Sequence, residues 1–211
     1  MSDGSSTVRD ARGLPGAADG FERLWTPHRM VYVKGDRPSA DQGSGCPFCE
    51  APHLPDEDSL IVHRGRTAYV VLNLYPYNPG HLLVCPYRHV PLYTDTTTEE
   101  AAEMAELTQT AMLALGQAAG ASGYNLGMNQ GAVAGAGIAA HLHQHVVPRW
   151  TGDGNFLPII VRTKNMSQTL GETRQILADV WDRAARDHAA RQAANARAAA
   201  EHPRPGAGDP A

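Results

Sequence analysis

Histidine occupies the first, third and fifth positions of the segment HLHQHVVPRW, residues 141–150, and this pattern constrains the fold more than any other feature. Side chains of a β-strand alternate between the two faces of a sheet. A strand over residues 141–150 therefore places His141, His143 and His145 on one face and the residues between them on the other. Each imidazole carries two polar nitrogens that need partners when buried. Packing alone does not explain such a row, so we interpret it as a functional site.

A glycine-rich segment precedes the histidines and narrows the chemistry. Alternating histidines suit metal ligation, acid–base catalysis or attack on phosphorus by a neutral imidazole. The last of these requires donors that stabilise charge on the phosphate. Residues 131–137 (GAVAGAG) lie directly upstream, and we expect them to enter the strand at Ile138. Because small residues let consecutive backbone N–H groups approach an anion, the segment predicts a phosphate pocket.

Cys46 and Cys49 form a C-x-x-C pair, which has three interpretations. The first is half of a zinc site, completed by distant imidazoles such as His89 and one histidine of the row. The second is a redox dithiol, which should follow a strand and open a helix. Two prolines in the next six residues make a long helix there improbable. The third is a pair without a metal or redox role.

Short apolar runs bounded by turn residues predict strands, and apolar residues at helical spacing predict helices. The predicted strands cover residues 31–33, 60–62, 67–75, 81–87, 124–129, 141–150 and 156–161. Residues 76–80 are turn formers, so the two strands beside them form a hairpin. Thr97 and Glu100 fit a capping box that opens a central helix, and a last helix begins near Ser167. Hairpins with a central and a trailing helix predict an α+β fold with a mainly antiparallel sheet.

Composition divides the 211 residues into three parts. Residues 1–20 are glycine-rich with little to bury, which predicts a disordered tail. Residues 21–181 are expected to form a single domain. Residues 182–211 are rich in Ala and Arg, so they are expected to form a helical extension or a disordered tail.

Charge and cysteine usage exclude several classes of protein. A net charge of -4 argues against a nucleic-acid binder, and three cysteines are too few for a disulfide scaffold. No run approaches the roughly 18 apolar residues of a membrane span. The first residues lack the apolar core of a secretory signal, so we expect a cytoplasmic protein without a membrane partner.

Taken together, the motifs resemble the histidine triad (HIT) family, whose signature is His-x-His-x-His-x-x with apolar x. The segment HLHQHVV matches this signature except for the polar Gln144. The other matching segments follow in the family's order: CPFC (46–49), LNLYPYNPGHLLVCPYRHV (72–90) and GMNQGAVAGAG (127–137). The resemblance implies a sheet of about five antiparallel strands with a central and a C-terminal helix, paired into a homodimer.

The resemblance also implies roles for particular residues. The middle histidine, His143, would attack the α-phosphorus to form a covalent nucleotidyl-histidine, and His145 would hydrogen-bond the phosphate or bridging oxygen. A structural zinc is implied, without an organic cofactor, and its ligands would be Cys46, Cys49, His89 and His141. The implied nucleotide contacts are Asn73 for the ribose and Asn129, Gly135, Ala136, Gly137 and His145 for the phosphates.

Two features bear on the acceptor of the nucleotidyl group. Larger phosphorylases of the family carry Gln where this chain has His145, which favours hydrolysis with release of AMP. The flanking segments LWTP (24–27) and HVVPRWTGDGNF (145–156) instead resemble an actinobacterial group that cleaves diadenosine tetraphosphate with inorganic phosphate to ADP and ATP. We expect phosphorolysis, with hydrolysis of dinucleoside polyphosphates or nucleoside phosphoramidates as the alternative. Gly137 stands where some members of the family use a Gln or Ser donor, so we expect a backbone N–H to replace that donor.

Two readings from other classes stay open. A zinc-stabilised nucleotide-binding module would keep the four metal ligands but give His143 no covalent role. A metallohydrolase would hold its metal directly at the histidine row, which would require carboxylate ligands, and none lies within residues 141–150.

Overall fold

The computed structural model describes residues 45–153 and 168–201 of the chain. Its elements are α2 (Pro47–Glu50), η2 (Ala51–His53), α3 (Asp56–Ser59), β1 (Ile61–Arg64), β2 (Ala68–Leu72), β3 (Leu82–Pro86), η3 (Tyr93–Asp95), α4 (Thr98–Ala119), β4 (Gly123–Gly127), η4 (Ala132–Ala134), β5 (Gln144–Arg149) and α6 (Leu170–Glu201). The predicted tail 1–20 and the predicted strands at 31–33 and 156–161 lie outside the described residues. In the described part, no helix is long and apolar enough to span a membrane.

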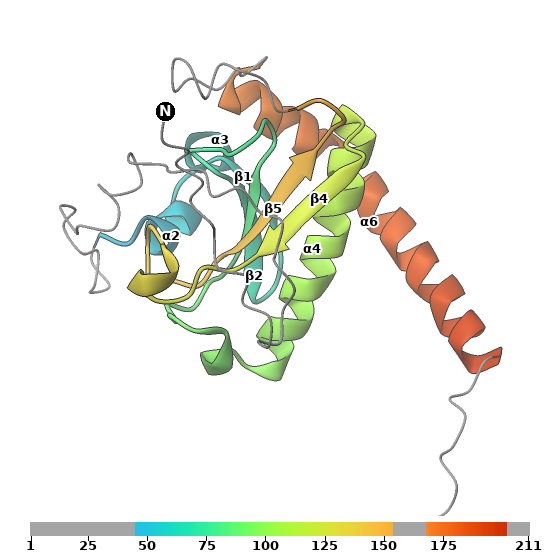
Figure 1. The fold of residues 1–211 in the computed structure, drawn as a ribbon, viewed down its shortest axis with the longest axis horizontal. Coiled ribbons are helices and arrows are strands. Elements are labelled where there is room, and N and C mark those ends of the chain that lie inside the picture. Colours follow the sequence, from blue (N-terminus) through green and yellow to red (C-terminus); the bar gives the residue numbers. More distant parts are fainter. Residues whose placement is uncertain (1–44, 154–167, 202–211) are drawn as a thin grey trace, which may run out of the picture. The chain divides into compact units, whose positions relative to one another are not determined.

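The five strands form one antiparallel sheet in the order β1-β2-β3-β5-β4 (Figure 1). The predicted α+β class, with a five-stranded antiparallel sheet, a central helix and a C-terminal helix, is confirmed. The predicted hairpin is β2 and β3, which pair from Ala68 opposite Pro86 to Leu72 opposite Leu82.

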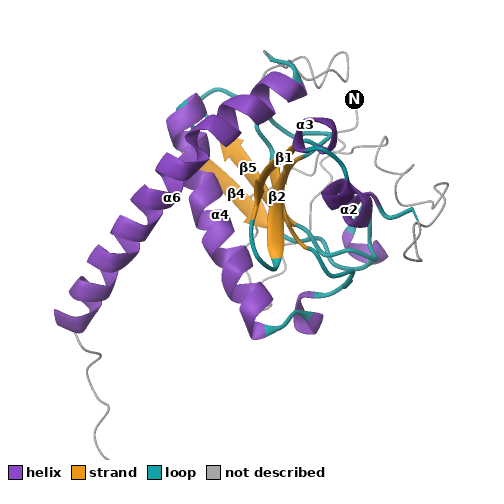
Figure 2. Cartoon of the chain, turned by 180° about the vertical axis from the view of Figure 1, so that it is seen from behind, coloured by secondary structure: helices purple, strands orange, loops and turns teal. Residues whose placement is uncertain are grey.

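The two long helices cover one face of the sheet, as the view from behind shows (Figure 2). Alternate strand residues point into this layer, where they meet apolar residues of α4 and α6. The buried side chains of this core include Val70, Leu72, Val84, Met104, Leu115, Leu142, Val146, Leu177 and Trp181. A smaller cluster on the other face contains Ile61, Tyr69, Val71, Leu83 and Cys85. The histidine-bearing face is therefore opposite the helices.

Local capping explains where both long helices begin. Thr97 and Glu100 form the predicted capping box, and Gly120 ends α4 in the left-handed conformation. Thr169 and Glu172 make the same reciprocal hydrogen bonds, so α6 starts at Leu170, slightly later than predicted. The helix then continues to Glu201.

The predicted strand over 141–150 is too long, because β5 begins only at Gln144. In the continued register, Leu142 would face Pro86, which has no N–H to donate. The carbonyl oxygens of Pro86 and His141 instead accept from histidine side chains. The glycine-rich loop likewise does not enter a strand at Ile138, because it contains η4 and leads into further turns.

Candidate functional site

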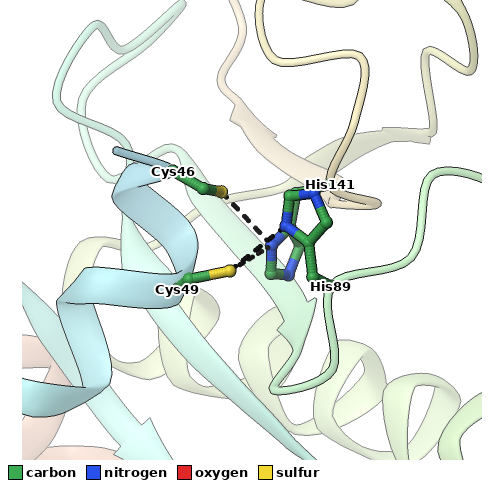
Figure 3. A group of neighbouring side chains, drawn as sticks. All are labelled: Cys46, Cys49, His89 and His141. Carbon is green, nitrogen blue, oxygen red and sulfur yellow. Dashed lines mark hydrogen bonds between the residues drawn. The ribbon is translucent and has the colours of Figure 1, made fainter. Parts of the chain in front are cut away.

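Three segments far apart in the sequence bring together four metal-ligating side chains (Figure 3). The single turn of α2 places Cys49 beside Cys46, the loop after β3 supplies His89, and the segment before β5 supplies His141. Their ligand atoms all lie within 4.8 Å of one another. The Sγ atoms of Cys46 and Cys49 each lie 3.4 Å from Nδ1 of His141. The predicted quartet is therefore assembled in space and could hold a metal ion.

The surroundings orient this quartet for a cation. Nε2 of His141 lies 2.9 Å from the carbonyl oxygen of Pro86, which can only accept, so Nε2 carries the proton and Nδ1 faces the cysteines. Nδ1 of His89 lies 3.2 Å from Sγ of Cys49. Burial and the neighbouring Cys46 raise the pKa of the Cys49 thiol to about 11. A bound cation would supply the positive charge that these thiols need to ionise.

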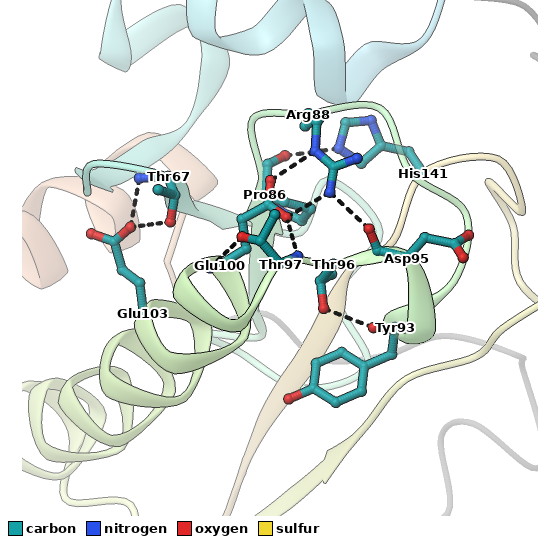
Figure 4. A network of polar contacts seen from close by, with 10 residues as sticks. All are labelled: Thr67, Pro86, Arg88, Tyr93, Asp95, Thr96, Thr97, Glu100, Glu103 and His141. Carbon is teal, nitrogen blue, oxygen red and sulfur yellow. Dashed lines mark hydrogen bonds and ion pairs between the residues drawn. The ribbon is translucent and has the colours of Figure 1, made fainter.

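The loop that carries His89 is held by a polar network at the start of α4, in which Arg88 takes part (Figure 4). Arg88, the neighbour of His89, donates to both carboxylate oxygens of Glu100, at 3.0 and 2.7 Å. Arg88 also donates to the backbone carbonyl of Asp95 at 2.7 Å. Because Glu100 is also the capping-box residue of α4, the network fixes the loop that carries His89 against that helix.

The middle histidine has one nitrogen fixed and the other available. Nδ1 of His143 lies 2.8 Å from the carbonyl oxygen of His141 and must donate to it, so Nε2 of the neutral ring carries a lone pair. The ring of Phe48, from the C-x-x-C turn, packs against His143 at a centroid distance of 5.0 Å and against His141 at 5.5 Å. The Cys/His quartet and His143 are therefore linked through the carbonyl of His141 and through the ring of Phe48.

The third histidine is oriented by His81, a residue that the sequence analysis placed only in a strand. Nδ1 of His81 accepts from the backbone N–H of Tyr77 at 3.0 Å and lies 3.2 Å from the amide nitrogen of Asn73. Its Nε2–H therefore donates to Nδ1 of His145, 2.9 Å away. The proton of His145 is left on Nε2, a buried atom without a hydrogen-bond partner within the described residues.

Burial keeps these rings neutral. It lowers the pKa of His143, and together with the neighbouring His143 it lowers the pKa of His145 to about 4. Near pH 7 the pair thus presents an unprotonated nitrogen on His143 and an N–H donor on His145. A nucleophile beside a hydrogen-bond donor is the arrangement that attack on a phosphate needs.

The residues predicted to contact the nucleotide make fewer contacts with the three histidines within the described part of the chain. The side-chain nitrogen of Asn73 lies 3.2 Å from Nδ1 of His81, and the side-chain oxygen of Asn73 accepts from the N–H of Tyr75 at 3.0 Å. Gly131 and Gly135 have φ angles of +76° and +80°, a conformation that favours glycine, at either end of the turn η4. The assignment of Asn129, Gly135, Ala136 and Gly137 to phosphate contacts stays a prediction.

Sequence reasoning missed His81 and Phe48. His81 directly follows the turn residues 76–80 and precedes Leu82, which pairs with Val146. Aligning the hairpin strand with the histidine strand could have placed it beside the row. Phe48 gave no comparable signal, because its contact with His143 depends on how the C-x-x-C turn packs.

The sheet carries a row of histidines and a Cys/His quartet at one end. Comparison with known proteins identifies the class that this combination defines. A family model described as the HIT domain matches residues 55–152. A Mycobacterium tuberculosis protein named AP-4-A phosphorylase is 48% identical over 177 residues, covering 82% of this chain and 90% of the relative. The chain belongs to the HIT-domain family.

Solved structures agree with this assignment. A Zn-bound histidine triad family protein from Mycobacterium smegmatis matches with a TM-score of 0.53 at 26% identity, over 66% of this chain and 94% of the other. A hypothetical histidine triad nucleotide-binding protein from Sulfolobus tokodaii also matches with a TM-score of 0.53, at 28% identity, over 67% and 93%.

Proposed function

We propose that this protein cleaves dinucleoside polyphosphates through a covalent nucleotidyl-histidine, and that it acts as a diadenosine tetraphosphate phosphorylase. The observation that carries the proposal is that two adjacent imidazole rings, His143 and His145, are opposite tautomers. His143 has Nδ1 bound to a backbone carbonyl, so its Nε2 is the nucleophile, whereas His145 has its proton on Nε2. The ring centroids lie 5.0 Å apart, so both can reach one phosphate group.

In the first step, Nε2 of His143 attacks the α-phosphorus of diadenosine tetraphosphate. A phosphorus–nitrogen bond forms, the bond from that phosphorus to the bridging oxygen breaks, and ATP leaves. The Nε2–H of His145 hydrogen-bonds the phosphate or bridging oxygen as negative charge builds there. In the second step, an oxygen of inorganic phosphate attacks the same phosphorus, the phosphorus–nitrogen bond breaks, and ADP leaves with His143 again neutral.

The choice of phosphate over water rests on the relative of the same family. That protein is named AP-4-A phosphorylase, and the alignment spans most of both chains. Hydrolysis with release of AMP is the second candidate, favoured by the presence of His145 where larger phosphorylases of the family carry Gln. We also assign ribose contact to Asn73 and phosphate contact to Asn129 and residues 135–137.

We assign zinc to the quartet formed by Cys46, Cys49, His89 and His141. A tetrahedron with the usual Zn–S and Zn–N bond lengths has sulfur–nitrogen edges of about 3.5 Å, close to the 3.2 and 3.4 Å contacts between these cysteines and histidines. Two thiolates and two imidazoles suit this ion, and the Zn-bound relative has the same fold. With all four positions filled by protein, the ion would supply structural stability.

We further propose a homodimer in the cytoplasm, as the family resemblance implies. The strand β4 lies at one edge of the sheet, and Asn125, Leu126 and Gly127 are exposed there. An edge of this kind offers unpaired backbone groups to a second copy.

The experiment that tests the function is product analysis on diadenosine tetraphosphate, with and without millimolar inorganic phosphate. We expect repeated turnover to ADP and ATP in equal amounts only with phosphate, and without it at most one ATP per active site. Release of AMP without phosphate would make the protein a hydrolase. Nucleotide binding without turnover in either reaction would support the binding-module reading and contradict the proposal.

A further inference from the structure

A groove continues from the histidines along the same face of the sheet. Strand alternation puts His145, Val147 and Arg149 of β5 on the face away from α4 and α6, and Asn125 of β4 pairs with Val147. The groove is lined by Tyr77, Asn78, Asn125, Val147 and Arg149 and encloses about 270 Å³. This volume lies just below the ~300–1,000 Å³ of sites for drug-sized ligands, so the groove suits one ring system rather than a whole dinucleotide.

The far end of the groove is polar but carries no net charge. Arg149 donates to both carboxylate oxygens of Asp153, at 2.6 and 2.8 Å. A further N–H of Arg149 donates to the side-chain oxygen of Asn125 at 2.8 Å. Asn78 donates to Asp153 at 2.9 Å and to the carbonyl of Pro148 at 3.0 Å. Because the bidentate carboxylate offsets the guanidinium, this end suits a neutral hydrogen-bonding ligand better than a phosphate.

The near end of the groove reaches the reacting groups. The ring of Tyr77 stacks on that of His145 at a centroid distance of 5.7 Å and an interplanar angle of 17°. Tyr77 therefore connects the donor of the first step to the groove. An aromatic ring at one end and amide side chains at the other match a nucleoside, whose base and ribose offer a flat ring and neutral polar groups.

We propose that this groove is the subsite for the nucleoside of the leaving nucleotide. The inference rests on the proposed function, since it assigns the half of the dinucleoside polyphosphate that departs when His143 is modified. In this arrangement the bridging oxygen lies at His145, and the distal nucleoside lies in the groove between Tyr77 and the amides of Asn125 and Asn78. The groove would thus distinguish a dinucleoside polyphosphate from a mononucleoside polyphosphate.

The test compares diadenosine tetraphosphate with adenosine 5′-tetraphosphate, which lacks the distal nucleoside. The measured quantity is the ratio of the two kcat/KM values, each obtained with saturating phosphate. Asn125→Ala removes an exposed amide on the edge strand β4, and size-exclusion chromatography and thermal unfolding check that the variant keeps the fold and the oligomeric state of the wild type. The matched control, Asn195→Ala, removes the same amide from the exposed end of α6.

We expect the ratio to fall about tenfold in Asn125→Ala, as the loss of one or two hydrogen bonds predicts, and to stay at the wild-type value in Asn195→Ala. An unchanged ratio in Asn125→Ala would overturn the proposal. An equal loss on both substrates would also overturn it, because the groove would then act on the shared polyphosphate. If the wild-type protein cleaved neither substrate, the proposed function itself would fail.

Discussion

The histidines of the site differ in which ring nitrogen meets a fixed partner. A backbone carbonyl accepts from Nδ1 of His143, whereas a backbone N–H donates to Nδ1 of His81. These two contacts set opposite tautomers, and His81 passes its tautomer on to His145. Chemically identical side chains thereby become an acceptor and a donor on either side of one proposed phosphate position.

A substitution at His81 tests this relay. We expect His81→Leu to lower kcat about tenfold or more, because the tautomer of His145 is then no longer fixed and its charge-stabilising donor is weakened. His81→Gln should recover much of the activity, since its amide can accept from the N–H of Tyr77 and donate to His145. Steady-state kinetics and thermal unfolding of both variants check the prediction. Equal losses in both variants at equal stability would argue for a role in packing only.

At the scale of single residues, the sequence predicts which side chains could react or bind a metal, but not the hydrogen bonds that join them. The spacing of His141, His143 and His145 predicts a functional site, and the C-x-x-C pair predicts metal ligands. The tautomer of His143 is set within its own segment by the carbonyl of His141, whereas that of His145 is set by His81, which strand pairing brings beside it. No local pattern encodes such contacts.

Among the elements, α4 connects the core to the loop that carries His89. Its capping residue Glu100 also pairs with Arg88, the neighbour of His89. The hydrogen bonds from Arg88, with those from Thr97, lower the pKa of the Glu100 carboxyl from 4.5 to about 2. A carboxyl whose folded-state pKa is depressed stabilises the fold above its unfolded pKa, and that contribution is lost as the pH falls through the folded value.

Glu100→Gln should therefore destabilise the protein at pH 7 by about 1 kcal/mol, because the amide keeps the cap but loses the charge that faces Arg88. The difference from wild type should shrink as the pH falls from about 4.5 toward 2. Denaturant unfolding across this range measures it. Glu106→Gln, an exposed change on the same helix, is the control. A difference that stays constant with pH would show that the ion pair contributes nothing.

Element boundaries depended on side chains that local patterns do not specify. The capping box at Thr97 was readable from the sequence and is present. The start of β5 could not be predicted from the sequence, because the carbonyls of Pro86 and His141 accept hydrogen bonds from imidazoles rather than from a strand partner. The periodicity of the histidines thus overestimated the length of the strand, and only His145 of the three lies within β5.

In the whole molecule, the proposed metal quartet draws its ligands from α2, the loop after β3 and the segment before β5. The quartet therefore lies beside His143, and Phe48 of α2 packs against the ring of His143. The sequence could propose four ligands, whereas their assembly at one end of the sheet required the strand order β1-β2-β3-β5-β4.

Removal of the metal tests this arrangement. We expect about one zinc per chain by elemental analysis, and chelation should lower the melting temperature by roughly 5 °C or more. Cys49→Ser should lose the zinc, whereas His143→Asn should retain it. Loss of zinc in His143→Asn would instead place the metal at the histidine row and favour the metallohydrolase reading.

The central claim is that His143 carries the nucleotidyl group, and intact-mass analysis tests it most directly. Protein mixed with diadenosine tetraphosphate without phosphate should gain the mass of one AMP moiety, and fragmentation should locate it on His143. His143→Asn should show no adduct and no turnover, whereas His53→Asn, an exposed change, should behave as wild type. An adduct on another residue, or wild-type turnover by His143→Asn, would contradict the account.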